Sequence, residues 1–492
     1  MSAPRMKMEH ALGGIARASS VPSARRALPA LAGLVAALAL GGCVNLAPEL
    51  QRPALAVPAQ LPAPAGSATG TVAQADWQAL LQDDRLRQVV ALALQNNRDL
   101  RVAVLNVERS QAALRLSDAD RWPTVSAALI GQRTPSTSTG KPVNSFQAGL
   151  QVSSYELDLL GRLRNASDAA AATLMGTEAA ARSARLALET QVAGAWLTLA
   201  ADAEQLALAR KTLATRDETL KLTTLRAKVG AVADIDLTGV QALSAAAQSA
   251  VAQLERQVAQ DRNALTLLVG TTVPEALLPA TPLQGKAWLA AVPAGLSSQA
   301  LLSRPDVIQA EQTLAAANAN IGVARAAMWP RITLSGSGGQ ASSELSSLFD
   351  PGHFAFTLAA NAGVALFDAG RNRANVASAT AGRDIAVAQY EKAVQMAFRE
   401  AADALQSQAS WTTQLQAQKT QLAAERERHR LTKLRYDVGG ASLLDWLDAE
   451  RSLVTAEQAM VQVQLGELLN RLALYKALGG SEAAASGAGS AG

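Results

Sequence analysis

An internal duplication constrains the fold of this 492-residue chain more than any other feature. Three short motifs recur in the same order at an offset of 207 or 209 residues. The pairs are Trp122-Pro123 with Trp329-Pro330, Gly161-Arg162 with Gly370-Arg371, and Val229-Gly230 with Val438-Gly439. Such regular spacing is hard to obtain by chance, so the chain is predicted to contain two copies of one structural unit.

Each copy is predicted to begin with a helix and to continue as strands. The helices, at residues 100–120 and 307–328, are rich in Ala and end at Trp-Pro, where proline cannot donate an amide hydrogen bond. Apolar residues then alternate with small or polar ones, which is typical of strands with one apolar face. The alternating apolar positions are Phe146, Ala148, Leu150 and Val152 in the first copy, and Ile332, Leu334, Phe354, Phe356, Leu358, Ala360, Ala362, Val364 and Leu366 in the second.

The four strands predicted from this pattern fit a membrane barrel, with the apolar face toward lipid and the polar face toward a wet lumen. Stretches rich in Ser, Thr, Gly and Pro, at residues 134–144 and 338–352, are predicted to be exposed loops between the strands. A soluble two-sided sheet is the alternative, and the export signal described below favours the membrane. Four strands cannot close a barrel alone, and an open edge in lipid would leave unpaired backbone groups. Several chains are therefore expected to pool their strands.

Very long helices follow the strands. Residues 165–228 contain no Pro and would extend about 96 Å at ~1.5 Å per residue. Apolar residues recur every seven positions, which predicts coiled-coil packing. These positions are Val192, Leu199, Leu206, Leu213 and Leu220, and in the last helix Leu447, Val454, Val461, Leu468 and Tyr475. The chain is predicted to reverse at Gly230 and at Gly439 and Gly440, with Asp234 and Ser442 as the N-caps of the returning helices.

The basic pI of 9.3 belongs to a targeting segment. Residues 1–42 hold five of the 45 Lys and Arg residues and one of the 41 Asp and Glu residues, so the remainder is balanced and no nucleic-acid partner is expected. An apolar run at residues 27–40 leads to Leu40-Gly41-Gly42-Cys43, which resembles a bacterial lipobox whose Cys is lipidated. By this resemblance, an Asp directly after the Cys would be associated with retention in the inner membrane. Val44 follows instead, so the outer membrane is the expected destination. An ordinary signal peptide with a chance Cys is the alternative.

The predicted domains follow from these features. They are a signal peptide at 1–42, a lipidated tether at 43–75, a first repeat at 76–270, a linker at 271–303, a second repeat at 304–478 and a flexible tail at 479–492. Catalytic groups are scarce in the mature chain, where the two His residues are predicted at a strand edge (His353) and on a charged helix surface (His429). The run at residues 425–428 is expected to be a solvated face. No enzymatic activity, cofactor or metal is expected.

The combined motifs resemble the TolC-type outer membrane factor family, in its NodT-like branch of efflux lipoproteins. The motifs are the lipobox, the duplicated plan, and the segments at residues 155–162, 304–307 and 366–371. The resemblance implies a homotrimer whose twelve strands close a barrel in outer-membrane lipid, above a periplasmic α-helical coiled-coil tunnel. It also implies a periplasmic membrane-fusion adaptor and an inner-membrane efflux pump of the RND type as partners. A type I protein secretion conduit and a non-conducting lipid-anchored scaffold remain as alternatives.

The resemblance further implies a gate at the periplasmic mouth. Its motif places Asp445 and Asp448 in two carboxylate rings, which would attract cations, and Tyr436 and Asp437 beside the turn. Ser442 and Asp445 also fit a capping box, so Asp445 has a structural role as its alternative. Some relatives carry a basic residue where this chain has Ala441, so its closed tip must be locked by other pairs.

Overall fold

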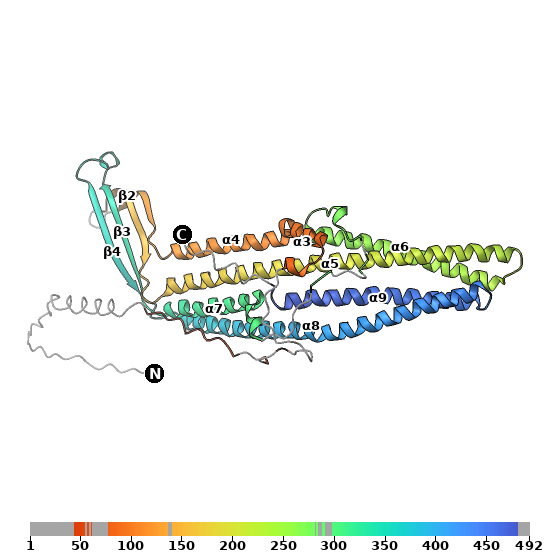
Figure 1. Cartoon of the computed structure of the whole chain (residues 1–492). Coiled ribbons are helices and arrows are strands. Elements are labelled where there is room, and N and C mark those ends of the chain that lie inside the picture. Colours follow the sequence, from red (N-terminus) through yellow and green to blue (C-terminus); the bar gives the residue numbers. More distant parts are fainter. Residues whose placement is uncertain are drawn as a thin grey trace, which may run out of the picture.

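The chain forms an elongated molecule with a sheet at one end and two helical hairpins at the other (Figure 1). A computed structural model describes residues 44–54, 57–58, 61, 77–135, 140–280, 282–283, 288–290 and 298–480. After α2 (Trp77–Leu80) and α3 (Asp84–Asn96), one order of elements occurs twice. None of the helices in these described ranges is both long enough and apolar enough to cross a membrane.

The first series has α4, β1, β2, α5 and α6, and the second has α7, β3, β4, α8 and α9. Their bounds are α4 (Arg98–Ala119), β1 (Val125–Pro135), β2 (Pro142–Glu156), α5 (Arg162–Lys228), α6 (Asp234–Val269), α7 (Pro305–Ala326), β3 (Arg331–Ser342), β4 (Phe354–Gly363), α8 (Arg371–Asp437) and α9 (Leu443–Ala477). Short 3-10 helices are η2 (Glu275–Leu277), η3 (Ser298–Ser303) and η4 (Leu345–Ser347). Because α5 and α8 each have 67 residues, each extends about 100 Å.

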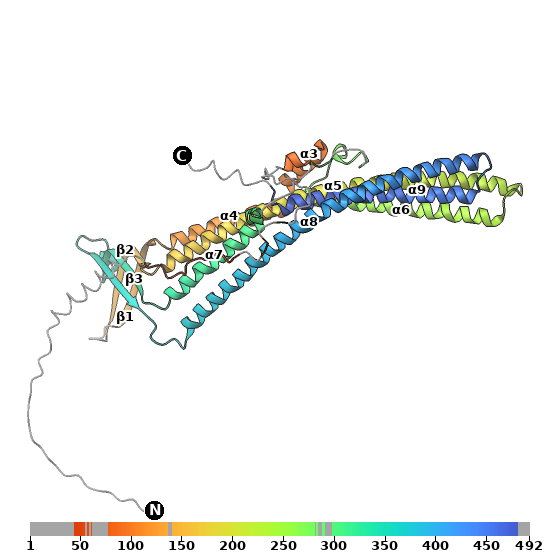
Figure 2. The same ribbon diagram turned by 60° about the horizontal axis from the view of Figure 1, so that its bottom comes forward.

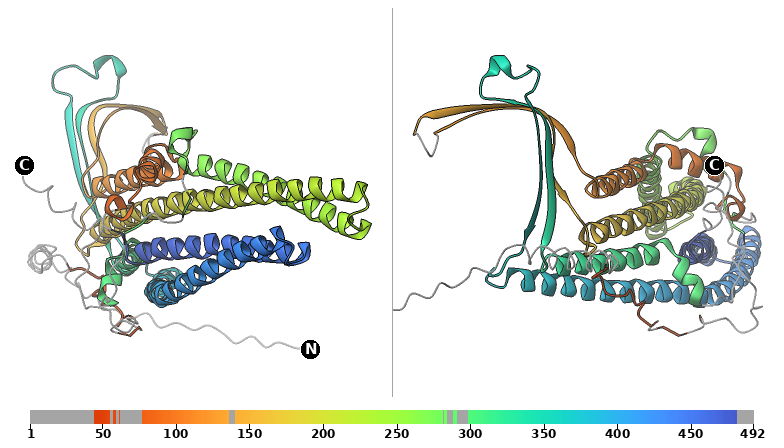
Figure 3. Two further views of the ribbon diagram at one scale, coloured as in Figure 1. Left: turned by 45° about the vertical axis from the view of Figure 1, so that its right-hand side comes forward. Right: turned by 90° about the vertical axis from the view of Figure 1, so that its left-hand side faces the viewer.

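The four strands form one antiparallel sheet in the order β1-β2-β3-β4. It stands across the end of the helices, with β1 and β2 turned away from β3 and β4 (Figure 3). All ten residues of β4 are exposed, so this strand has no core on either face within one chain. The sheet therefore lacks the packing that a soluble sheet obtains from a covering layer.

Two predicted loops are shorter than expected. β1 continues to Pro135 and β2 begins at Pro142, and the pair Thr134↔Val143 belongs to the ladder. β3 continues to Ser342, so residues 338–342 of the second predicted loop are strand. Small polar residues indicated a loop, but cross-strand hydrogen bonds satisfy their backbone. At the other end of the alternating run, β4 stops at Gly363, so Val364 and Leu366 lie beyond the strand.

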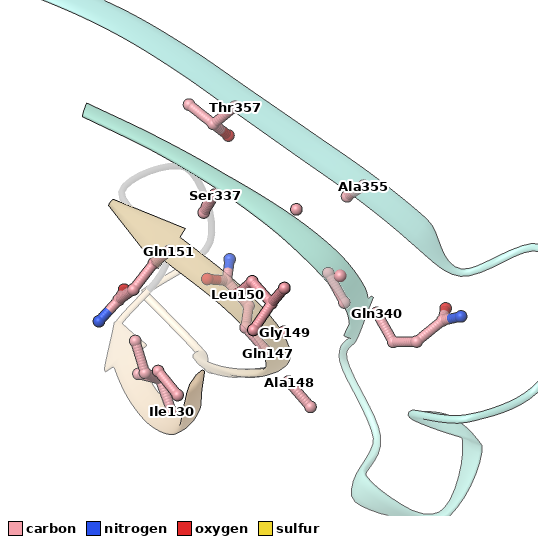
Figure 4. A pocket seen from close by; sticks show the side chains of 14 residues that line it. Ile130, Gln147, Ala148, Gly149, Leu150, Gln151, Ser337, Gln340, Ala355 and Thr357 are labelled. Carbon is pink, nitrogen blue, oxygen red and sulfur yellow. The ribbon is translucent and has the colours of Figure 1, made fainter. Parts of the chain in front are cut away.

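Glycines permit the close approach of the middle strands. Gly149 of β2 pairs with Gly339 of β3. A Cβ atom on Gly149 would overlap the backbone of Gly338, and one on Gly339 would overlap the backbone of Ala148. Figure 4 shows the hollow at this crossing, which side chains of β1 to β4 surround. Only glycine fits this pairing without moving a strand.

The junction between sheet and helices is held by charged groups. The Glu156 carboxylate accepts from Nε and Nη2 of Arg162, both at 2.7 Å, and also pairs with Arg331. Gly161 adopts a φ of +70° at the start of α5, and the Asp158 carboxylate accepts from the Arg164 amide at 2.8 Å. These contacts explain why the segment at residues 155–162 combines acidic, glycine and basic residues.

The two helical hairpins, α5–α6 and α8–α9, lie side by side and end at the same end of the molecule (Figures 1 and 2). All ten predicted heptad positions are buried or half-buried, which confirms the predicted packing. The prediction for Asp234 was wrong, because Ala233 in extended conformation is the N-cap of α6 and Asp234 is already in the first turn. There its negative charge interacts favourably with the positive end of the helix dipole and so stabilises α6.

An equatorial core, defined here as the largest cluster of buried apolar residues, joins both hairpins near their middle. It contains Val192, Trp196 and Leu199 of α5, with Val461 and Leu468 of α9. Trp196 is fully buried, donates from Nε1 to the Leu277 carbonyl at 2.9 Å and meets the ring of Trp288 edge-on at 5.3 Å. This core fixes how the two hairpins sit relative to each other.

Candidate functional site

The candidate site is the tip of the two hairpins, where the predicted gate residues lie. Gly230 and Gly439 occupy the reversals with φ of +70° and +79°, a conformation that glycine adopts without steric cost. The Gly439 amide donates to the Tyr436 carbonyl at 3.0 Å, and the Gly440 amide donates to the Arg435 carbonyl at 2.7 Å. These bonds close the end of α8 before the chain turns into α9.

Asp445 forms the capping box at the start of α9. The Ser442 hydroxyl oxygen accepts from the Asp445 amide at 3.1 Å, and the Asp445 carboxylate accepts from the Ser442 amide at 3.0 Å. Its bonds with Ser442 lower the pKa of Asp445, so the carboxylate is negative at neutral pH. The structural alternative for Asp445 is therefore present, and the carboxylate is still exposed at the tip.

Asp448 lies one turn further along α9, between two guanidinium groups. Its carboxylate accepts from Arg428 of α8 at 3.2 Å and from Arg451 at 2.5 Å. Arg428 also donates to the Ser452 hydroxyl at 2.9 Å. The charge run at residues 425–428 was predicted to be a solvated face, and residues 426–428 are exposed. The exposed guanidinium of Arg428 in addition cross-links α8 to α9.

Arg428 is the residue that the sequence reasoning missed. It supplies a cation near Asp448 although the chain has Ala441 in the position where a basic residue was sought. A signal was available, because residues 428 and 448 lie equally far from Val438 at the reversal. Residues equidistant from a hairpin turn face each other across antiparallel helices.

Tyr436 and Asp437 belong to an aromatic cluster at the end of α8. The ring of Tyr436 stacks on Trp446 at 5.2 Å, and its hydroxyl accepts from Arg226 of α5 at 3.3 Å. Asp437 forms an ion pair with Lys433 at 3.1 Å. The ammonium of Lys433 lies 5.4 Å from the centre of the Trp446 ring. Tyr436 therefore joins the two hairpins at the tip, while Asp437 contacts its own helix.

His429 has a different environment from the charged surface that was predicted. It is half-buried, and its Nε2 accepts a hydrogen bond from Trp446 Nε1 at 3.3 Å. Burial lowers the pKa of His429, and the nearby Lys433 and Lys211 lower it further. The imidazole is therefore neutral at neutral pH, as its role as an acceptor requires.

Two clefts whose linings mix charged and apolar residues flank the contact between the hairpins. One, of about 460 Å³, lies between α5 and the second hairpin and is lined by Arg226, Tyr436 and Glu450 among others. The other, of about 830 Å³, is lined by Arg216, Asp445 and Asp448 among others. No group of three or more His, Cys, Asp or Glu residues in the described part of the chain could hold a metal ion. The tip thus concentrates charged and aromatic contacts where the two hairpins meet.

The N-terminal segment is partly described. Cys43 and the predicted signal peptide lie outside the described residues. Residues 44–54 run beside α7, where Arg325 donates to the Leu46 carbonyl at 3.2 Å and Asn318 donates to the Pro48 carbonyl at 2.7 Å. Since Arg325 lies at the end of α7 that leads into β3, residue 46 is near the sheet end of the molecule.

Comparisons with known proteins support one relationship. The model of the family described as outer membrane efflux protein matches residues 89–271 and 296–480. The toluene efflux pump outer membrane protein TtgC of Pseudomonas putida is 40% identical over 458 residues, which cover 91% of this chain and 94% of the relative. The outer membrane protein OprJ of Pseudomonas aeruginosa is 37% identical over 454 residues, with 91% and 95% covered.

Solved structures show the same relationship. The open state of the MtrE outer membrane channel of Neisseria gonorrhoeae has a TM-score of 0.81 and 36% identity to this chain. The match covers 89% of this chain and 98% of that one. Each of the two stretches that match the family contains one strand pair and one helical hairpin.

Proposed function

The chain belongs to the outer membrane efflux protein family, and we propose that it acts as a homotrimer that carries small molecules out of the cell. It is an outer-membrane channel component of a tripartite efflux system, with its helical tunnel in the periplasm. The following paragraphs give the support for the proposed assembly, gate, anchor and partners.

The sheet supports the trimer. Every residue of β4 is exposed, and within the described residues β1 and β4 each pair along one edge only. In lipid, an unpaired edge leaves amides and carbonyls without partners, which costs several kcal/mol for each group. Three copies would supply twelve strands, enough to close the sheet around a wet lumen.

The tip supports the gate. In a trimer, Asp445 and Asp448 would each occur three times around one axis, beside Tyr436 and Asp437. Because Asp448 already pairs with Arg428 and Arg451, we propose that Asp445 gives the more strongly cation-attracting ring. We further propose that Gly230, Gly439 and Gly440 form the turns that the adaptor meets.

The anchor and the partners are also proposals. We propose that Cys43 is lipidated after removal of residues 1–42, and residue 46 lies near the sheet end, where the membrane would be. The name of TtgC describes it as the outer membrane protein of a toluene efflux pump, and we propose small organic compounds as substrates of this chain. A periplasmic membrane-fusion adaptor and a proton-driven inner-membrane pump of the RND type would complete the system. We propose no catalytic role for the chain.

Planar bilayers with the lipidated trimer provide the test. Low, cation-selective conductance is expected from the wild type, and the Asp445→Ala/Asp448→Ala variant should conduct more and select less. Asp236→Ala is the matched control, because Asp236 is the counterpart of Asp445 in the first repeat. Conduction that ignores the double substitution would move the gate elsewhere, and a trimer that never conducts would favour the scaffold alternative.

A further inference from the structure

The two hairpins share an apolar core only near their middle. Beyond the equatorial core, toward the tip, each hairpin has a separate small apolar cluster among the described residues. The α5–α6 hairpin contains Leu206, Ala209 and Val251, and the α8–α9 hairpin contains Leu422, Ala456 and Met460. The part of each hairpin between the equatorial core and the tip therefore keeps its own packing if the two hairpins move apart there, while the equatorial core holds them together.

Toward the tip, the last residues that α5 buries are polar. From residue 210 to its end, α5 buries only Arg216, Thr219 and Thr223. Arg216 Nη2 lies 3.1 Å from Glu450 Oε2 of α9, and the two side chains are 6% and 8% exposed. A desolvated ion pair thus joins one hairpin to the other at a place where apolar contacts are lacking.

The surroundings of this pair make it easy to separate. Arg216 Nη1 is buried without a hydrogen-bond partner among the described residues, and Glu450 Oε2 has the ion-pair contact with Arg216 but no hydrogen bond there. Burial raises the pKa of Glu450, and Arg216 opposes that rise. Arg216 lines one of the two clefts and Glu450 lines the other, so both charges would meet water once the helices part. The rehydration of both ions offsets the loss of their attraction, which does not happen when apolar surfaces separate.

We propose that Arg216 and Glu450 form a clasp that sets the closed position of the second hairpin against the first. Both are positioning residues, since they act through the placement of Asp445 and Asp448 on α9. The clasp rests on the proposed channel function. Arg226 and Tyr436 add an exposed contact between the hairpins at the tip. The clasp defines one closed geometry, and the equatorial core is the hinge.

The first variant removes one charge. Glu450→Gln leaves the Arg216 guanidinium buried without a counter-ion in the closed state only, so the closed state loses stability relative to the open one. The open probability of single channels in planar bilayers should rise by at least about tenfold. The matched control is Glu255→Gln, which removes an exposed pair with Arg210 (2.8 Å) inside the first hairpin and should leave the open probability unchanged.

The second variant distinguishes a specific clasp from a general loosening of the helices. Arg216→Met/Glu450→Met replaces both charges by apolar side chains that pack in place, which is often neutral or stabilising for a buried pair. Its open probability should equal or fall below that of the wild type, although it carries more changes than Glu450→Gln. A general loosening of the helices would instead make the double variant at least as open as the single one.

The outcomes distinguish the clasp from the channel. Open probability of Glu450→Gln equal to that of the wild type and of Glu255→Gln would overturn the clasp, as would a double variant as open as the single one. If Asp445→Ala/Asp448→Ala conducts in those cases, the channel function stands and the clasp alone fails. If neither that variant nor the wild type conducts, the proposed function itself fails. Size-exclusion chromatography confirms that each variant is a trimer.

Discussion

Two neighbouring glycines in β3 offer a controlled test of the strand crossing. A methyl group at Gly339 would overlap the carbonyl of Ala148 and the Cα atom of Gly149, which are backbone atoms that cannot rotate away. A methyl group at Gly338 would meet only the ring of Phe354, at 3.9 Å, which is ordinary contact. The same substitution at adjacent positions therefore meets opposite surroundings.

The expected energies have opposite signs. Gly338→Ala should stabilise the chain by about 0.4–1 kcal/mol, because the unfolded state loses conformational freedom and the folded state gains no clash. Gly339→Ala gains the same term but forces β2 and β3 apart, at a cost of about 1–3 kcal/mol for overpacking. The net effect should be a loss of up to about 2.5 kcal/mol.

The fraction of the proposed trimer that survives heating in detergent measures this difference. Gly339→Ala should lose the trimer at a lower temperature than the wild type, and Gly338→Ala at the same or a higher temperature. Equal behaviour of the two variants would refute the inferred β2–β3 contact, because they share the change in chemistry and differ only in what the methyl group meets. Loss of the trimer in Gly338→Ala alone would mean that Gly338, and not Gly339, faces the backbone of β2.

Three further predictions concern the helices. Arg428→Gln should increase cation selectivity, because Asp448 keeps its charge and loses a cationic partner at 3.2 Å, and an unchanged reversal potential under a salt gradient would contradict this. Ser442→Ala should cost about 1 kcal/mol of helix stability through loss of the N-cap and shift the thermal midpoint without changing the ion preference, so a change of selectivity alone would count against it. Burial, together with the hydrogen bond and the negative charge of Asp261, raises the pKa of Asp202 to about 6. The protonated form therefore stabilises the fold fully below the unfolded value of 3.8, and that contribution is lost as pH rises through about 6. Asp202→Asn, which stays neutral, should raise the thermal midpoint at about pH 8 and leave it unchanged at about pH 4, and an equal effect at both pH values would contradict the shared proton.

The order of elements could be predicted because local chemistry determines it. Trp-Pro ends α4 and α7, heptads run through α5 and α9, and glycine reverses the chain at residues 230 and 439. Each of these signals depends on a few neighbouring residues. The strand ends were predicted less well, because small polar residues form loops or strands according to the partner that their backbone finds.

The candidate site was predicted in part for the same reason. Asp445, Asp448, Tyr436 and Asp437 could be found from a short motif, and the capping box from residues three apart. The contacts of Arg428 with Asp448 and of His429 with Trp446 lie outside that motif, because both residues reach α9 only when the hairpin folds back. Only the spacing about the turn pointed to the first of these contacts.

The sequence by itself determined the duplicated plan, the long helices and their turns, since these follow from periodicity and from residues close in the chain. The tertiary structure alone decided where the hairpins share a core and where they meet through charge. Arg216 and Glu450 are 234 positions apart, and neither belongs to a motif. Their pairing depends on how α5 packs against α9, because an ion pair is short-ranged and no local pattern encodes a partner that distant.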